Sequence, residues 1–144
     1  MCRFYKAIEV RFGDLDALGH VNNARYLTYM EQARIGYFAH LRLRRLRDPD
    51  VSFILADAHI AFLRPLFLDD KVRIGVRVVR LGNKSFTMHY RFEDADGKIV
   101  FATGETVQVC YNYKQQCTIP LPPAWRQRIA EFESIPAFAQ GAYR

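Results

Sequence analysis

Residues 11–26 of this chain read RFGDLDALGHVNNARY. The stretch predicts the end of a strand, then a short acidic loop that contains a glycine, and then the start of a long helix. A carboxylate placed just before a helix lies beside backbone N–H groups that have no partner within that helix. Such a pair suits chemistry on a carbonyl group, because one member can attack the carbon while the other stabilises the negative oxygen. The loop is therefore a candidate reaction site as well as a helix entrance.

The long helix is expected to begin at Asn22 or Asn23, since asparagine is a good N-cap, and to run to about Leu41. Because these asparagines can cap the helix, Asp16 is not needed as its N-cap. Apolar residues recur along the helix at spacings of three and four, which predicts a buried stripe. The stripe and the residues that widen it are Tyr26, Leu27, Tyr29, Met30, Ala33, Ile35, Tyr37, Phe38 and Leu41. A helix this apolar must be covered on more than one side.

The rest of the chain shows the alternation of apolar and polar residues that is typical of strands. Residues 5–12 suit one strand, and nearly all of residues 52–113 read as further strands. Residues 81–84, Leu-Gly-Asn-Lys, and residues 94–97, Asp-Ala-Asp-Gly, predict hairpin turns, the first with a Gly-Asn pair that tolerates positive φ. Pro123 predicts the start of a short helix over residues 124–133.

Hairpin-length connections force neighbouring strands to be antiparallel, and an apolar sheet face must cover the apolar helix. We therefore predict an α+β fold, in which an antiparallel sheet of about five or six strands wraps around one long central helix. A short C-terminal helix follows the sheet. The 144 residues, half of them hydrophobic, are expected to form a single domain over residues 1–144.

The composition bears on membrane insertion, cellular location and metal binding. No apolar run is long enough to span a membrane, and the first residues lack the apolar core of a signal peptide. The three cysteines, Cys2, Cys110 and Cys117, have no metal-type or redox-type spacing and are expected to be reduced thiols in a cytoplasm. No group of histidine, cysteine or acidic residues has convincing metal spacing, so no metal is expected.

The net charge of +6 fits a partner that carries phosphates. Part of the excess lies in Arg42, Arg44, Arg45 and Arg47, which follow the helix. They suit a solvated helix end, where cations complement the helix dipole, and the alternative is a landing site for a nucleotide phosphate. No basic stripe with interleaved aromatic residues is present, so nucleic acid is not an expected partner. A membrane is not expected either, because no apolar run is long enough to span one.

Residues 14–23, followed by Tyr26, resemble the hot-dog fold, and more narrowly the 4-hydroxybenzoyl-CoA thioesterase family of acyl-CoA thioesterases. Residues 29–34, Tyr-Met-Glu-Gln-Ala-Arg, residues 62–65, Phe-Leu-Arg-Pro, and residues 84–86, Lys-Ser-Phe, agree with later parts of the family. The resemblance covers about residues 5–133. It implies hydrolysis of an acyl-CoA thioester to the free acid and CoA, with CoA as part of the substrate and no bound cofactor.

The resemblance also implies roles for residues of the loop. Asp16 matches the carboxylate that attacks the thioester carbonyl or directs a water onto it, and the backbone N–H of Asn23 matches the donor that polarises the carbonyl oxygen. Gly19 matches the glycine that lets the loop turn, and His20 could orient a water, act as a base or simply bond to the backbone. Asp14 reads as an acceptor that shapes the loop.

The same resemblance places Tyr26, Arg64, Lys84 and Ser85 at the substrate, although Tyr26 also suits the core. The turn before Lys84 is Gly-Asn, where some members carry basic residues that meet CoA phosphates. Members of the family form dimers, often paired into tetramers, with the sites at the dimer interface.

Three alternatives stay open at this point. The His-Val-Asn-Asn variant at residues 20–23 is shared with plant acyl-carrier-protein thioesterases, so the carrier could be CoA or acyl carrier protein. A non-catalytic module that binds acyl thioesters could use the same fold. A hot-dog hydratase is a third reading, although it would need a catalytic Asp/His pair on a differently arranged loop.

Overall fold

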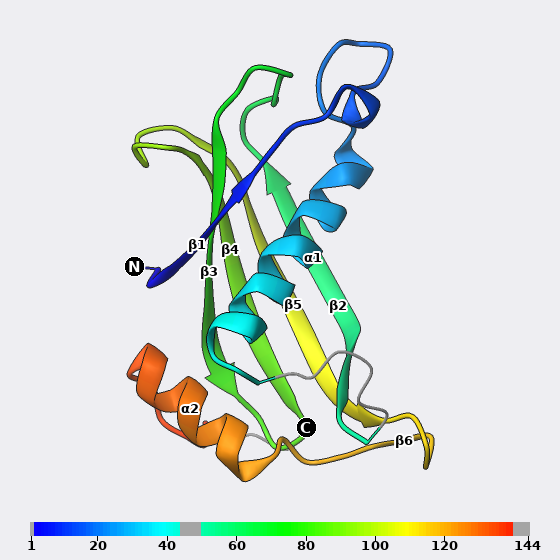
Figure 1. Ribbon diagram of the computed structural model, residues 1–144, viewed down its shortest axis with the longest axis vertical. Coiled ribbons are helices and arrows are strands. Elements are labelled where there is room, and N and C mark those ends of the chain that lie inside the picture. The colour runs from blue at the N-terminus through cyan, green and yellow to red at the C-terminus, as the bar shows by residue number, and fades with distance from the viewer. Residues whose placement is uncertain (1, 44–49, 140–144) are drawn as a thin grey trace. The chain divides into compact units, whose positions relative to one another are not determined.

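The computed structural model describes residues 2–43 and 50–139, and it combines two α-helices with a six-stranded antiparallel sheet (Figure 1). The elements in chain order are β1 (Phe4–Ile8), the 3-10 turn η1 (Phe12–Asp14), α1 (Asn23–His40), β2 (Ser52–Phe62), β3 (Val72–Leu81), β4 (Ser85–Asp94), β5 (Val100–Asn112), β6 (Cys117–Thr118) and α2 (Pro123–Glu133). The strands follow the order β1-β3-β4-β5-β2, and β6 pairs with β5. The predicted α+β class, the long first helix and the short last helix are confirmed.

The chain divides into two compact units, which we describe separately. Unit 1 holds Met1–Tyr37, Ile60–Val76 and Tyr90–Gly104, and unit 2 holds Phe38–His59, Arg77–His89 and Glu105–Arg144. The assignment of residues 1–144 to a single domain stays a prediction.

In unit 1, α1 buries one side against the strands. Tyr26 is 2% exposed, and its ring centroid lies 4.9 Å from that of Phe62 and 5.3 Å from that of Phe92. Leu27 and Ile35, which were expected in the buried stripe, are 44% and 45% exposed. The strands of unit 1 therefore cover only part of the apolar surface of α1, and the predicted burial of Leu27 and Ile35 is wrong for the single chain.

Two local predictions also need correction. The first strand ends at Ile8 rather than at residue 12, because the chain turns at Arg11, whose backbone oxygen accepts the N–H of Asp14 at 2.9 Å. The turn at residues 81–84 forms, with the N–H of Gly82 donating to the oxygen of Ser85 at 2.7 Å. It needs no positive φ, however, because the only glycines with positive φ in the described ranges are Gly19 and Gly97.

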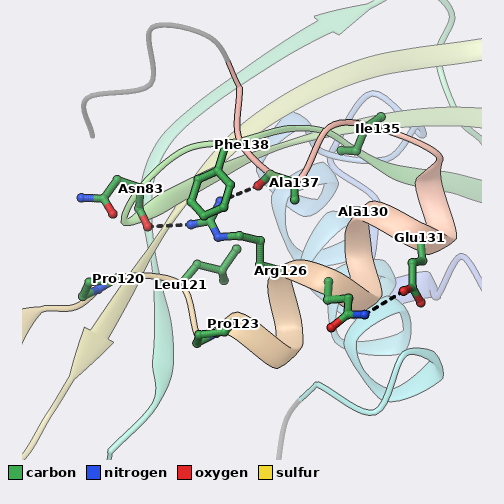
Figure 2. Close-up of a pocket in the computed structure, with 11 residues that line it drawn as sticks. Asn83, Pro120, Leu121, Pro123, Arg126, Ala130, Glu131, Ile135, Ala137 and Phe138 are labelled. Carbon is green, nitrogen blue, oxygen red and sulfur yellow. Dashed lines mark hydrogen bonds between the residues drawn. The ribbon is translucent and has the colours of Figure 1, made fainter.

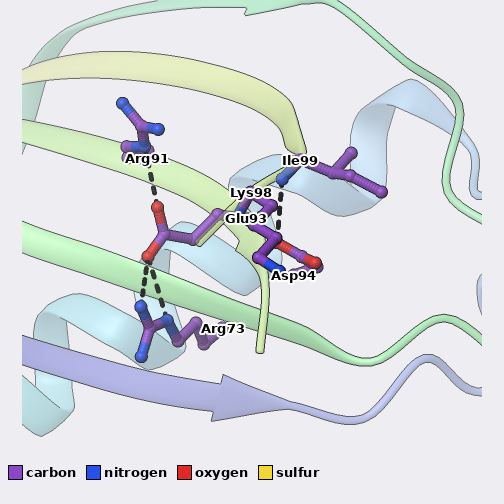
Figure 3. A network of polar contacts seen from close by, with 6 residues as sticks. All are labelled: Arg73, Arg91, Glu93, Asp94, Lys98 and Ile99. Atoms are coloured by element: carbon purple, nitrogen blue, oxygen red, sulfur yellow. Dashed lines mark hydrogen bonds and ion pairs between the residues drawn. The ribbon is translucent and has the colours of Figure 1, made fainter. Parts of the chain in front are cut away.

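A buried carboxylate of β4 joins β4 to β3 in unit 1 (Figure 3). Glu93 is 4% exposed, and its Oε1 accepts from Nε and Nη2 of Arg73 at 2.9 and 2.8 Å. Its Oε2 accepts from Nε of Arg91 at 2.8 Å, and the guanidinium of Arg73 lies 4.1 Å from the ring centroid of Tyr5. Because both carboxylate oxygens are paired, the cost of burying this charge is offset.

In unit 2, Phe53 forms the centre of an aromatic cluster with Phe38, Phe86 and Trp125 of α2. Burial raises the pKa of the Cys110 thiol to about 12, and all three cysteines are thiols rather than disulfides. Of the basic cluster after α1, Arg42 is exposed, and residues 44, 45 and 47 lie outside the described residues. Neither helix of the described part is long and apolar enough to cross a membrane.

Candidate active site

The acidic loop before α1 is closed by its own backbone. The N–H of Asp16 donates to the oxygen of His20 at 3.0 Å, and the N–H of Gly19 donates back to the oxygen of Asp16 at 3.0 Å. The N–H of Val21 donates to the oxygen of Leu66 at 2.8 Å, which ties the end of the loop to the segment after β2. Gly19 has φ +86°, a conformation that residues with a Cβ rarely adopt. The loop is therefore a tight turn that depends on this glycine.

Replacing Gly19 by alanine is expected to lower the free energy of unfolding by about 1–2 kcal/mol, because a Cβ is strained at this φ. A Cβ at Gly19 would meet no atom within 4 Å, so the loss would come from the backbone rather than from a clash. Gly13 is the matched control, since it lies in the same loop, has open space around it and has no positive φ. Urea unfolding of the Gly13→Ala variant should show little change or a small gain; equal losses in the two variants would contradict the assignment.

The two carboxylate oxygens of Asp16 have different contacts: one accepts a backbone N–H of the loop, and the other lies near His20. Its Oδ1 accepts the N–H of Leu18 at 2.9 Å, which makes an Asx turn. Its Oδ2 lies 3.8 Å from Nδ1 of His20, and the Asp16 side chain is 25% exposed. Nδ1 of His20 also lies 3.2 Å from the oxygen of Val21, so the backbone contact expected for this histidine is present. Asp16 thus caps the loop turn rather than the helix and keeps one oxygen free of backbone contacts.

The first turn of α1 presents a backbone donor. Oδ1 of Asn22 accepts the N–H of Ala24 at 2.9 Å, and the oxygen of Asn22 accepts the N–H of Arg25 at 2.9 Å. Asn22 is therefore the N-cap, as predicted, and Asn23 is the first helical residue. Within residues 2–43 and 50–139, the backbone N–H of Asn23 has no hydrogen-bond acceptor. This N–H and the positive end of the helix dipole are available to a negatively charged oxygen.

Asp14 holds the loop to the helix. Its Oδ2 accepts the Tyr29 hydroxyl at 2.6 Å and the N–H of Arg11 at 3.0 Å, and its Oδ1 lies 3.7 Å from Nε of Arg25. Burial, followed by the hydrogen bond to Asp14, raises the pKa of the Tyr29 hydroxyl. The interpretation of Asp14 as a loop-shaping acceptor agrees with these contacts.

Two hollows of unit 1 adjoin the loop and the first turns of α1. One, of about 400 Å³, is lined by Gly13, Leu15, Asp16, Asn22, Ala24, Arg25 and Thr28. The other, of about 220 Å³, is lined by His20, Val21, Asn23, Tyr26, Phe62, Leu63, Arg64 and Pro65. The structure therefore brings His20, Asn23, Tyr26 and Arg64 together, whereas Asp16 opens into the neighbouring hollow.

The remaining predicted substrate residues lie in unit 2 and line neither hollow. Nζ of Lys84 donates to Oγ1 of Thr118 at 3.3 Å, and Ser85 is buried at the start of β4. Arg25 and Thr28 line the hollow of Asp16 and were not among the predicted site residues. Their spacing of three residues places them on one face of α1 and was the available signal. No group of three histidine, cysteine or acidic side chains that could hold a metal occurs in the described ranges.

Comparison with known proteins identifies the family of this chain. Residues 10–129 match the Thioesterase-like superfamily. A thioesterase from Thermus thermophilus, solved with coenzyme A and Zn, shares 40% identity over 92% of this chain and 95% of its own, with a TM-score of 0.79. The long-chain acyl-CoA thioesterase FadM of Escherichia coli is 29% identical over 86% of this chain and 95% of its own. A 1,4-dihydroxy-2-naphthoyl-CoA hydrolase of Synechococcus elongatus is 31% identical over 78% of this chain and 85% of its own.

The strand order and the long helix define a hot-dog fold, and the family match and the similar proteins make it one of the thioesterase class. The chain belongs to the Thioesterase-like superfamily. The narrower membership of the 4-hydroxybenzoyl-CoA thioesterase family stays a prediction.

Proposed function

We propose that this protein is an acyl-CoA thioesterase, which hydrolyses an acyl-CoA thioester to the free acid and CoA. The observation that carries the proposal is the presence, beside the start of α1, of both the Asp16 carboxylate and the unbonded N–H of Asn23, which line adjoining hollows. The similarity to FadM and to the coenzyme A-bound Thermus thioesterase supports the substrate class. The chemistry needs no bound cofactor or metal, and CoA enters only as part of the substrate.

In the proposed mechanism, the N–H of Asn23 donates to the thioester carbonyl oxygen as that oxygen becomes negative. The Asp16 carboxylate either attacks the carbonyl carbon or takes a proton from the water that does so. In the first case an acyl-aspartyl anhydride forms and the CoA thiolate leaves, and water then cleaves the anhydride. If His20 donates its Nδ1 proton to Val21, its Nε2 is an acceptor that can orient the water.

The direct test is release of free thiol from a panel of acyl-CoA thioesters of different chain length, with aromatic members and acyl carrier protein thioesters included. We expect thiol release from CoA thioesters with turnover. A binding module without catalysis would bind the same thioesters and release no thiol, which would contradict the proposal. Faster release from the acyl carrier protein thioesters would show that the natural carrier is acyl carrier protein rather than CoA.

The reduced cysteines favour the cytoplasm as the location of the protein.

We propose that two copies of the chain complete the site as a homodimer, which could pair again into a tetramer. β2 ends the strand order, so one edge of this 11-residue strand has no partner in the described chain. A long edge strand with exposed apolar residues, such as Leu55 and Phe62, tends to pair with another chain. The separate hollows of Asp16 and Asn23 also suggest that a single copy presents an incomplete site.

Replacing Ala58 by proline is expected to convert the dimer to a monomer and to abolish most thiol release. Ala58 lies near the middle of β2. We expect its N–H to face the open edge, where proline would remove a donor only from the partner contact. Light scattering after size exclusion measures the mass. A variant that remains dimeric and active would contradict pairing through β2.

A further inference from the structure

Unit 2 contains a hollow that the proposed reaction does not use (Figure 2). It has a volume of about 790 Å³, within the range of small-molecule sites. Most of its walls are apolar, and they come from the segment before α2, from one side of α2 and from the chain after α2. The lining residues are Asn83, Pro120, Leu121, Pro123, Arg126, Gln127, Ala130, Glu131, Ile135, Ala137 and Phe138.

The guanidinium of Arg126 lies in the wall of this hollow. Arg126 is 5% exposed, and its Nη1 donates to the oxygen of Ala137 at 2.7 Å. Its Nη2 donates to the oxygens of Gly82 and Asn83 at 2.7 and 3.0 Å. Guanidinium carries five N–H groups, so these three bonds leave two unbonded, one on Nε and one on Nη1, as separate donors.

The charge of Arg126 has no acidic partner. No carboxylate of residues 2–43 or 50–139 forms an ion pair with it. Glu131, the one acidic residue in the lining, is exposed and accepts from Nε2 of Gln127 at 3.0 Å. The cation is instead in contact with three carbonyl dipoles and with the ring of Phe138. The ring centroid lies 4.1 Å from the guanidinium carbon. Burial without a counter-charge lowers the pKa of Arg126, so an anion in the hollow would relieve an unfavourable state.

We propose that this hollow binds an amphipathic carboxylate, such as a free fatty acid, with its head on Arg126 and its tail on the apolar walls. A carboxylate meets guanidinium in the plane of the group, through its N–H edge. Phe138 covers the face of the group (Figure 2), so the stacked ring is compatible with an anion at the edge. Leu121, Ala130 and Ile135 supply the walls for the tail. The proposal rests on this geometry alone and does not depend on hydrolase activity.

Titration calorimetry with decanoate tests the proposal, with decanol as the ligand that has the same tail and no charge. We expect the wild-type protein to bind decanoate at one site and at least about tenfold more tightly than decanol, since hydrogen bonds to charged groups are strong. The Arg126→Met variant should lose about tenfold or more in decanoate affinity and keep its decanol affinity. The Arg128→Met variant is the matched control, because it removes the same charge from an exposed position of α2 outside the lining, and it should bind as the wild type does.

Because Arg126 also bonds three carbonyl oxygens, its loss could impair folding, and a second variant avoids this problem. Ala130→Phe keeps the cation and fills the hollow, so it should weaken binding of both decanoate and decanol. Failure of decanoate to bind the wild-type protein would overturn the proposal. Unchanged decanoate binding in Ala130→Phe would overturn it as well, because it would place the acid elsewhere on the protein.

Discussion

Replacement of Asp16 by asparagine is expected to lower kcat for thioester hydrolysis by about 10²–10⁴-fold, with a smaller change in KM. The amide oxygen of asparagine can still accept the N–H of Leu18, so the Asx turn is kept. What the variant loses is the negative charge that attacks the carbonyl or takes the proton of water. Steady-state thiol release, with KM and kcat measured separately, gives the result.

The Asp16→Ala variant separates structure from chemistry. It removes both the charge and the turn contact, so its kcat should fall as far as that of Asp16→Asn while its free energy of unfolding falls further. Near-normal turnover in Asp16→Asn would falsify the assignment of this residue. The Asp14→Ala variant should lose much less activity than either Asp16 variant; an equal loss would require a mechanism with two carboxylates.

The second large effect is expected at Asn23, where replacement by proline removes the backbone N–H itself. Proline is well accepted as the first residue of a helix, so α1 should still form. Loss of one oxyanion donor lowers kcat by about 10²–10³-fold in other enzymes, and we expect a loss of that size here. Thiol release under saturating substrate measures it, and circular dichroism checks that the helix is retained.

The control for this variant is Asn23→Ala, which removes the side chain and keeps the N–H. Since the helix is capped by Asn22, Asn23→Ala should retain most of the activity. If alanine and proline at this position reduce kcat equally, the side chain rather than the amide carries the effect. If neither does, another donor must stabilise the carbonyl oxygen.

Much of the fold could be predicted from the sequence because local chemistry sets its boundaries. Asn22 fixes the start of α1 through a contact two residues away, and Pro123 begins α2. The early end of β1 was not predicted, because the turn of Arg11 and Asp14 interrupts an apolar alternation that continues past Ile8, and Asp14 also bonds Tyr29, 15 residues later. The spacing of apolar residues likewise places Leu27 and Ile35 in or beside the buried stripe of α1. It does not show which other residues, if any, cover them.

The candidate site was likewise predictable where its residues are close in sequence, and not where they are distant. The loop residues Asp16, Gly19, His20 and Asn23 were found because they are close in sequence. Their distribution between two hollows was not foreseen, since it depends on how Phe62 and Arg64 approach the helix. Arg126 was missed because its partners, Gly82 and Asn83, lie 44 and 43 residues earlier. An arginine at a buried position of an otherwise ordinary helix gives no local sign of such contacts.

The most direct test of the account is a crystal structure of the assembled protein with a non-hydrolysable acyl-CoA analogue that retains the carbonyl group. We expect the analogue's carbonyl oxygen at hydrogen-bond distance, about 3 Å, from the backbone nitrogen of an Asn23. We also expect the carbonyl carbon to face an Asp16 carboxylate, in direct contact or through one water. A carbonyl group bound away from both residues, in every copy of the assembly, would contradict the account.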